Sequence, residues 1–391
     1  MLFADRRDVT SENDTSEENA ARAALIHREI LQLGILTLVA VLLFFITRAV
    51  AASNREMSLR DAAEWYRRGQ QGFSAGRVEE AIENFRRATV RNRTDKQYVL
   101  ALARALARNQ DDEAARSVLL TLRDTAPEDA EINLELARLA ARRQNVTEAA
   151  RYYDNALYAP WPIDSADARR RVRLELIRFL LTHDQSARAL SELLAAAADL
   201  PEQASVHLEV AELFGQAGDD THALDQFQRA LRLDPENGIA LAGAGLRAFQ
   251  LGRYGLARTY LGRTPIDVEK VRTTREIVER VLIDDPLAAR IRSGERRRRL
   301  MSDLDYARER LAACSPGPAG SPAGADVTLE READAFASHF KQQFLLDQDT
   351  IEAGVDLVDR IADRVVQACG SPAARDRALT LIGREHSGNS R

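Results

Sequence analysis

Apolar side chains recur at helical spacing along most of this chain, and the pattern is clearest between residues 219 and 238. That stretch reads DDTHALDQFQRALRLDPENG, in which Ala223, Phe227 and Ala230 are separated by mostly polar positions. Intervals of four and three residues place these side chains on one face of a helix, and Pro235 follows as a stop signal. The pattern therefore predicts an amphipathic helix whose apolar face packs against another helix.

The same spacing returns in frames of 34 residues. In the unit 204–237, Ala211, Phe214, Gly218 and Ala223 stand at the eighth, eleventh, fifteenth and twentieth positions. Related patterns fill five further units, with a short insertion after the third of these: 62–95, 96–129, 130–163, 170–203 and 238–271. Such a repeat predicts helix hairpins that are individually too small to bury their apolar faces and that make a core by stacking.

By these positions the sequence resembles the tetratricopeptide repeat family, and the six units cover just over half of the chain. The resemblance implies an all-α protein with a right-handed superhelix of about six hairpins over residues 58–265. Small residues at the eighth, twentieth and twenty-seventh positions let the helices approach, and large residues at the eleventh and twenty-fourth positions fill the space between them. These side chains are expected to build the scaffold and not to bind a ligand.

Residues 30–47 read ILQLGILTLVAVLLFFIT and contain no charge. Their length fits a membrane-spanning helix, and we place such a helix at 30–52, after a polar, acidic tail at 1–29. A buried core helix is one alternative, and a cleavable signal peptide ending at Ala49-Val50-Ala51 is another. The long acidic segment before the apolar run favours an uncleaved, single-pass anchor.

Helical patterning continues after the last repeat. We expect capping helices at 266–314, a Pro- and Gly-rich linker at 315–326 and a C-terminal helical subdomain at 327–391. Cys314 and Cys369, which are the only cysteines, flank the linker. Two interpretations remain open: a disulfide that ties the subdomain to the cap in an oxidising compartment, and two unrelated thiols.

Motifs for catalysis or cofactor binding are missing from the sequence. Residues 243–248 match GxGxx(G/A), but they lie inside a predicted helix with no strand before it, so we do not interpret them as a dinucleotide site. The arginine run 296–299 has acidic neighbours, which favours a solvated or salt-bridged face over an anion-binding patch. We therefore expect no enzyme, no cofactor and no metal, and the net charge of −5 gives no general attraction to nucleic acid.

In the tetratricopeptide family, the second, fifth, ninth, twelfth and thirteenth positions of each first helix line a concave groove. The fifth positions here would give a mostly apolar floor: Tyr66, Leu100, Leu134, Leu174, Leu208 and Ala242. Arginines fill several ninth and thirteenth positions, and we name this set the groove arginines: Arg104, Arg108, Arg138, Arg142 and Arg178. The alternative is that an arginine-rich protein places arginine on every exposed helix face.

Guanidinium groups suit carboxylates, so the resemblance and the groove arginines together predict a protein partner that offers an acidic segment or a C-terminal carboxylate. The sequence then fits a membrane-anchored scaffold for protein–protein interaction at the bacterial envelope. It equally fits an accessory or structural subunit of a larger membrane enzyme or secretion complex.

The side of the membrane is predicted by two opposing signals. Near the apolar run, Arg22 and Arg28 precede it and Arg48, Arg55 and Arg60 follow it, and this count slightly favours a cytoplasmic C-terminal side. An N-terminal span after a short tail is instead the layout of a signal anchor, which exports the domain behind it. We expect the bacterial inner membrane, with the soluble domain in the periplasm.

Overall fold

The computed structural model describes most of the chain as α-helices joined by short turns, with no strand among the described residues. The described backbone covers residues 9–93, 95–161, 165–314, 324–342, 347–369 and 372–387, and the described side chains leave out 9–21, 23–27, 314, 324–326, 368–369 and 387. The chain divides into two compact units, Met1–Pro162 and Ile163–Arg391. Each unit is described separately below.

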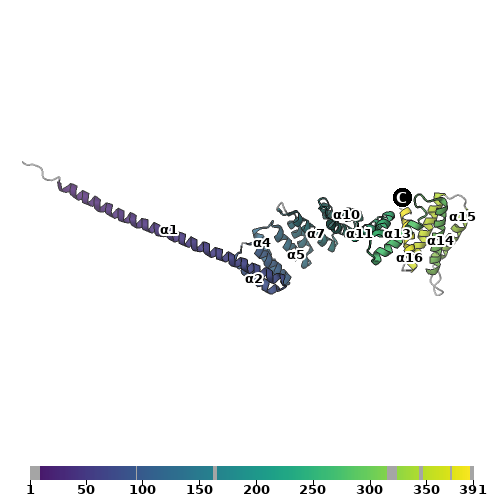
Figure 1. The fold of residues 1–391 in the computed structure, drawn as a ribbon, viewed down its shortest axis with the longest axis horizontal. Helices are drawn as coiled ribbons and strands as arrows, with labels where there is room; N and C mark the ends of the chain where they lie inside the picture. Colours follow the sequence, from purple (N-terminus) through teal and green to yellow (C-terminus); the bar gives the residue numbers. More distant parts are fainter. Residues whose placement is uncertain are drawn as a thin grey trace, which may run out of the picture. The chain divides into compact units, whose positions relative to one another are not determined.

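The first unit contains three helix hairpins (Figure 1). Its helices are α1 (Val9–Ser74), α2 (Val78–Arg91), α3 (Lys96–Arg108), α4 (Asp112–Thr125), α5 (Ala130–Arg142) and α6 (Val146–Leu157). The end of α1 pairs with α2, α3 pairs with α4, and α5 pairs with α6. Neighbouring hairpins stack through contacts of α3 with α2 and of α5 with both α3 and α4, so the hairpins share a core as the repeat pattern predicts.

The second unit begins with three more hairpins and continues into a group of C-terminal helices. The hairpins are α7 (Ala166–Thr182) with α8 (Ser186–Ala197), α9 (Ala204–Gln216) with α10 (Asp220–Leu233), and α11 (Gly238–Gln250) with α12 (Tyr254–Arg263). The C-terminal helices are α13 (Glu269–Asp284), α14 (Ser293–Cys314), α15 (Gly324–Gln342), α16 (Gln348–Cys369) and α17 (Ala374–Ser387).

The turn inside each hairpin is made by the same repeat position. The fifteenth residue of every unit has a left-handed backbone: Gly76, Gln110, Gln144, Asp184, Gly218 and Gly252, with φ between 58° and 86°. Glycine adopts this conformation without a steric cost, whereas the three other residues must tolerate it. The next residue often caps the second helix, since the side chains of Asp111, Asn145 and Asp219 accept hydrogen bonds from its first turn.

Small and large residues meet inside and between the hairpins as the repeat pattern predicts. A Cβ atom added to Gly69, at an eighth position, would lie 2.5 Å from the ring of Phe85 at the twenty-fourth position of the same hairpin. In the sixth hairpin, a Cβ on Gly245 would lie 2.6 Å from Leu261 at the same two positions. The helix backbones therefore approach closely because the eighth residue is small.

The C-terminal helices share one buried core with the last repeats. That core runs without a break from Ala211 in α9 to Ile382 in α17, so helices on both sides of the segment expected as a linker pack together. α17 packs on α13 and α16, and α16 also packs on α14. α15 begins at Gly324, inside the range expected as a linker, and residues 315–323 lie outside the described residues.

An ionic cluster fixes α17 to α13 and α14. Arg375 lies between two buried carboxylates, with Nε 3.1 Å from Asp284 and Nη2 2.9 Å from Asp303. Its guanidinium also lies 4.5 Å from the ring centroid of Tyr306. Burial raises the pKa of Asp303 to about 7, against the opposing effect of Arg375. Arg375 therefore joins α17 to α13 and α14, but its charge does not fully offset the cost of burying an ionised Asp303.

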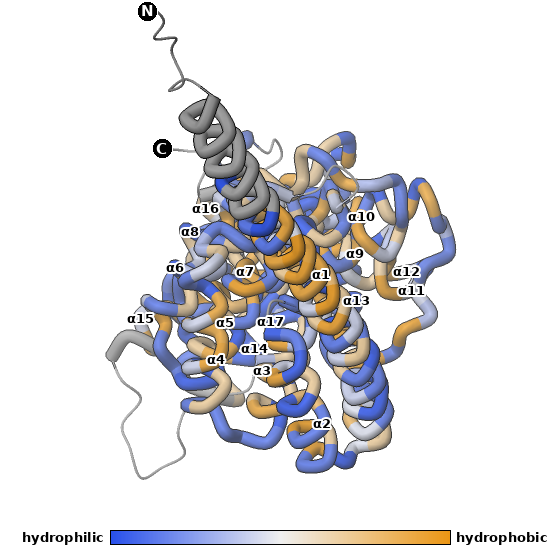
Figure 2. The backbone as a smooth tube through the Cα atoms, turned by 90° about the vertical axis from the view of Figure 1, so that its left-hand side faces the viewer, coloured by the Kyte–Doolittle hydropathy of each residue, from blue (hydrophilic) through white to orange (hydrophobic). Residues whose placement is uncertain are grey.

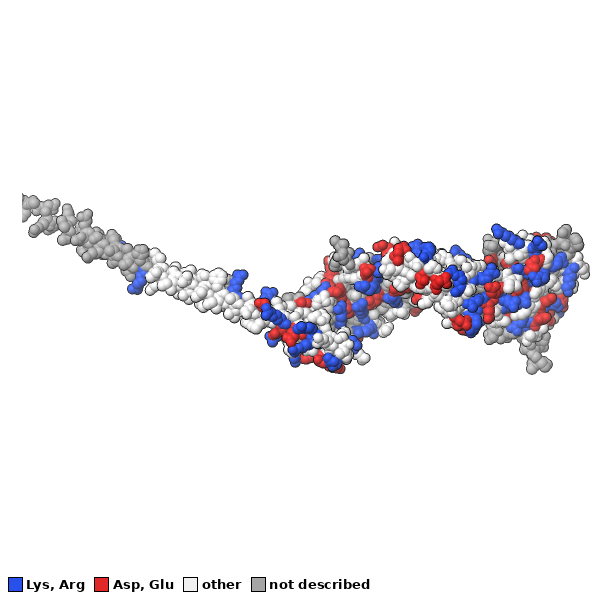
Figure 3. All heavy atoms as spheres, viewed as in Figure 1, with Lys and Arg blue, Asp and Glu red and all other residues white. Residues whose placement is uncertain are grey.

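The apolar run lies within α1 and has no packing partner among the described residues. Its large apolar side chains between Ile30 and Ile46 are 45–71% exposed. Figure 2 shows this stretch as a continuous hydrophobic segment, and Figure 3 shows it as an uncharged surface with basic side chains at both ends. Within the described residues it is the one helical stretch long and apolar enough to cross a membrane, and α1 continues from it into the first hairpin without a break.

Candidate functional site

The first helix of each hairpin carries the positions expected to line the groove. In the first unit these helices are the end of α1, α3 and α5. Tyr66 lies on α1, and its ring centroid is 4.7 Å from that of Tyr98 and 5.7 Å from that of Phe85. Tyr66 is only partly buried, so part of its ring remains accessible beside the aromatic cluster.

Three of the six side chains expected to form an apolar floor are buried. Leu100 is fully buried, and Leu174 and Ala242 are buried almost as completely. These side chains pack against neighbouring helices, which need the same apolar surface for stacking. Tyr66, Leu134 and Leu208 remain partly exposed, so the apolar surface open to a ligand is smaller than the repeat register suggested.

Arg104 and Arg138 share one carboxylate. Nε of Arg104 donates a hydrogen bond to Oε1 of Glu135 at 2.8 Å, and Nη1 of Arg138 donates to the same oxygen at 3.1 Å. The Glu135 side chain is only 11% exposed. Since Arg104 belongs to α3 and the other two residues belong to α5, this contact joins neighbouring hairpins.

Arg108 and Arg142 each reach back to the preceding hairpin. Nη1 of Arg108 is 3.4 Å from the carbonyl oxygen of Phe73, and the guanidinium lies 4.8 Å from the centroid of that ring. Nη1 of Arg142 donates to the carbonyl of Ala107 at 2.8 Å, and Nη2 donates to Asp112 at 2.9 Å. The turn amides of Gly76 and Gln110 already donate to these two carbonyls, so each arginine adds a second contact at a helix end, where positive charge is favourable.

The ninth-position pairing recurs in the second unit, where Arg178 on α7 pairs with Glu209 on α9. In both units the arginine contacts a glutamate 31 residues later, at the sixth position of the next repeat. Sequence reasoning missed Glu135 and Glu209 as partners. The constant separation was a usable signal, because a repeat register places the two positions on adjacent first helices.

Four groove arginines stay about half exposed despite these contacts. Their side chains are between 42% and 52% exposed: Arg104, Arg138, Arg142 and Arg178. A guanidinium has five N–H donors in one plane, and each contact described above uses one or two of them. A carboxylate can therefore bind Arg104 or Arg178 without displacing its glutamate, although that glutamate reduces the local positive potential.

The other candidate motifs have structural roles. Residues 243–248 lie inside α11, as expected for a chance match. In the arginine run, Arg298 and Arg299 pair with Glu295, which lowers the pKa of that carboxyl group, and Arg297 donates to the carbonyl of Phe340 at 2.9 Å. The salt-bridged interpretation of the run is thus confirmed.

The described residues contain neither a metal-binding group nor a described cysteine side chain. No group of three or more His, Cys, Asp or Glu side chains in the described part of the chain is placed to hold a metal ion. The side chains of Cys314 and Cys369 lie outside the described residues, so their pairing stays a prediction.

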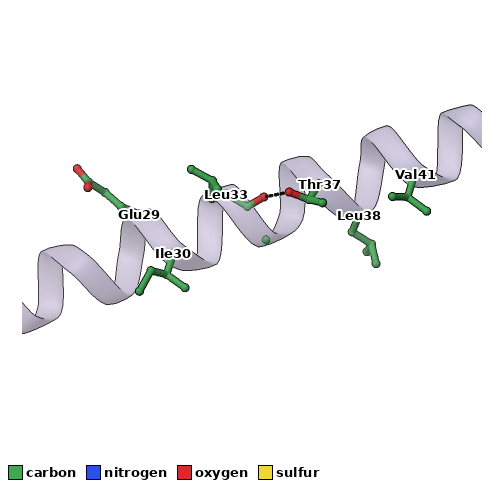
Figure 4. A pocket seen from close by; sticks show the side chains of 7 residues that line it. Glu29, Ile30, Leu33, Thr37, Leu38 and Val41 are labelled. Carbon is green, nitrogen blue, oxygen red and sulfur yellow. Dashed lines mark hydrogen bonds between the residues drawn. The ribbon is translucent and has the colours of Figure 1, made fainter.

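A surface depression along α1 is not a ligand site. It follows one helix from Glu29 to Val41, and no other described element closes it. Figure 4 shows its apolar side chains projecting from a single helix, with the hydroxyl of Thr37 donating to the carbonyl of Leu33 at 2.7 Å. This intrahelical bond satisfies the only hydroxyl in the depression, as an apolar environment requires.

Comparisons with known proteins agree with the repeat pattern. A family model described as the tetratricopeptide repeat matches residues 66–128, 100–168, 174–238 and 216–265. The matched ranges begin in the last part of α1 and end just after α12, and they include all the groove arginines. No curated protein matches the chain.

Several solved structures match the chain at low sequence identity. PilF of Pseudomonas aeruginosa is 17% identical, and the match covers 53% of this chain and 90% of that one with a TM-score of 0.40. YrrB, a protein with tetratricopeptide repeats and an unusual peptide-binding site, is 19% identical over 47% of this chain and 91% of its own, with a TM-score of 0.38. PilW, a type IV pilus biogenesis factor, is 17% identical over 54% of this chain and 97% of its own, with a TM-score of 0.40. The family model therefore identifies tetratricopeptide repeats in residues 66–168 and 174–265 of this chain.

Proposed function

We propose that this protein is a membrane-anchored scaffold whose groove binds an acidic or C-terminal segment of a partner protein. Tetratricopeptide repeats form interaction scaffolds, and the repeats here leave four groove arginines about half exposed. The observation that carries the proposal is the set of guanidinium donors on first helices, fixed in place by inter-hairpin contacts. Such fixed donors bind a carboxylate with little loss of conformational entropy.

The anchor is proposed from α1. Its apolar stretch exposes large side chains to an extent that water disfavours, and α1 enters the first hairpin as one continuous helix. The bacterial inner membrane and a periplasmic position for the repeats remain our proposal, from the signal-anchor layout of the sequence.

The groove is tested by charge reversal in the full-length protein held in detergent. A library of random decapeptides with free carboxyl ends supplies the probe, and fluorescence polarisation measures the affinity of selected peptides. We expect the selection to favour acidic peptides and the triple variant Arg104→Glu, Arg138→Glu, Arg178→Glu to bind them at least about thirtyfold more weakly. Affinity should also fall as salt rises.

The matched control reverses three exposed arginines on second helices, Arg86, Arg232 and Arg258, and should leave the affinity unchanged. Far-UV circular dichroism checks that both triple variants fold. If the groove variant binds acidic peptides as tightly as the control, the groove arginines serve only to join the hairpins.

The anchor is tested by alkaline extraction of membranes. The unchanged chain should stay in the membrane pellet, whereas Leu38→Arg with Leu42→Arg should release it, because each central arginine costs about 3 kcal/mol of insertion free energy. Leu59→Arg is the control, since Leu59 is exposed on the same helix outside the apolar run. Release of the unchanged chain would contradict the anchor.

A further inference from the structure

A cavity lies between the last repeat and the C-terminal helix. It has a volume of about 440 Å³ and is bounded by α11, α13 and α17. Each of these helices supplies one apolar wall, from Phe249, Ile277 and Leu381 respectively. Its charged lining comes from Lys270 on α13 and Arg377 on α17. We name this cavity the terminal pocket.

The two cations of the terminal pocket differ from the groove arginines. Both side chains are exposed, and neither makes an ion pair with a carboxylate among the described residues. Arg104, Arg142 and Arg178, by contrast, each contact a carboxylate of a neighbouring helix. An anion in the terminal pocket would therefore meet two cations that make no ion pair with a described carboxylate, although the carboxylate of Glu269 accepts a hydrogen bond from Thr273 of the lining.

The threonine hydroxyls of the pocket already donate hydrogen bonds within their own helices, so Lys270 and Arg377 are the main hydrogen-bond donors for a ligand. Thr274 donates its hydroxyl proton to the carbonyl of Lys270 at 2.7 Å, and Thr380 donates to the carbonyl of Arg377 at 2.9 Å. Thr273, the third threonine of the lining, donates to Oε1 of Glu269 at 3.2 Å. All three hydroxyls are thus committed to their own helices, and they offer only lone pairs to a ligand. A carboxylate, which accepts but does not donate, is best bound by the ammonium and guanidinium groups.

The volume of the terminal pocket fits the C-terminal end of a bound peptide better than an internal segment. One turn of α-helix, about 10 Å across and 5.4 Å long, already fills roughly 420 Å³, so the pocket takes only a few residues. A terminal residue carries its carboxylate and its side chain on the same Cα atom, and so matches paired cations beside apolar walls. An internal Asp or Glu would require the chain to leave the pocket in two directions.

The terminal pocket lies beside a groove position of the sixth hairpin, within the second unit. Phe249 is the twelfth residue of the sixth unit, a position that faces the groove in the family. α17 comes from outside the repeats and closes this end of the array by packing on α13. We propose that the terminal pocket binds the last residue of the partner segment, with its carboxylate held by Lys270 and Arg377 and its side chain apolar. This proposal rests on the proposed function, because it states where the C-terminal residue of the proposed partner segment binds.

The experiment compares two random decapeptide libraries, one with free carboxyl ends and one with C-terminal amides, on the full-length protein in detergent. We expect the first library to yield binders ending in a large apolar residue, and the amide forms of these binders to be at least about tenfold weaker. Lys270→Gln and Arg377→Gln should each weaken the free-acid peptides by about tenfold. Both side chains are exposed, so neither change threatens folding.

Arg280→Gln is the matched control, since Arg280 is an exposed cation on α13 outside the pocket lining, and it should not change the affinity. If acid and amide forms bind equally and Lys270→Gln has no effect while the groove reversal abolishes binding, the terminal pocket is refuted and the proposed function stands. If neither library yields a binder, both proposals fail.

Discussion

Alanine substitutions of Phe227 and Gly243, which lie in contact, test how the fifth and sixth hairpins pack. Phe227 on α10 is 3% exposed, and a Cβ atom added to Gly243 on α11 would lie 2.4 Å from the end of its ring. Replacing Phe227 by Ala should destabilise the fifth and sixth hairpins by about 3–5 kcal/mol, because the change removes buried surface and leaves a cavity. The same ring determines what happens at Gly243.

Replacing Gly243 by Ala has two opposing effects. The added methyl group overpacks the core against the ring at a cost of about 1–3 kcal/mol, while alanine favours the helix over glycine by about 1 kcal/mol. The single variant should therefore be neutral to about 2 kcal/mol less stable. In the Phe227→Ala background the ring is gone, so only the helix preference remains and the same change should stabilise by about 1 kcal/mol.

Native-state hydrogen exchange followed by mass spectrometry measures the free energy of opening for α10 and α11 directly, without assuming that both units of the chain unfold together. Gly262→Ala on α12 is the control, since a Cβ atom there meets nothing within 4 Å and the change should not depend on residue 227. If Gly243→Ala stabilises equally in both backgrounds, the ring does not occupy the space assigned to it. A loss below about 1 kcal/mol in Phe227→Ala would place that side chain outside the core.

Four further predictions follow from single features. The pKa of Asp303 is raised in the folded state, so the protein should lose stability as pH rises from about 4 to about 7, and Asp303→Asn should flatten this dependence in thermal melts recorded against pH. Glu135→Gln removes the charge shared by two groove arginines and should strengthen acidic-peptide binding several-fold in fluorescence polarisation, and weaker binding would contradict the electrostatic reasoning. Gln144→Gly relieves a left-handed backbone and should change the unfolding free energy by about 0 to +1 kcal/mol in urea titrations, whereas a clear loss would show that the side chain is needed. Labelling intact cells and spheroplasts with a bulky thiol reagent should modify Cys314 and Cys369 only after reduction and without breaching the inner membrane, and the opposite pattern would contradict both the disulfide and the periplasmic position.

The repeat spacing alone predicted the hairpins, because the residues that decide them are local. A small eighth residue lets a helix pair with the helix that follows it, and a left-handed fifteenth residue turns the chain between them. Gly69 and Gly76 show both effects within one hairpin. The apolar run in α1 was likewise evident, since eighteen uncharged residues need no tertiary contact to be recognised.

The tertiary structure decided what surrounds the candidate site. Leu100 stands at a groove position in the repeat register, yet stacking of the neighbouring hairpins buries it completely. Glu135 partly neutralises two arginines because α3 and α5 lie side by side. The terminal pocket requires α17 to pack on α13, from about one hundred residues later in the chain. Helical periodicity describes each helix by itself, whereas the free energy that selects such long-range partners comes from a shared core and its buried ion pairs.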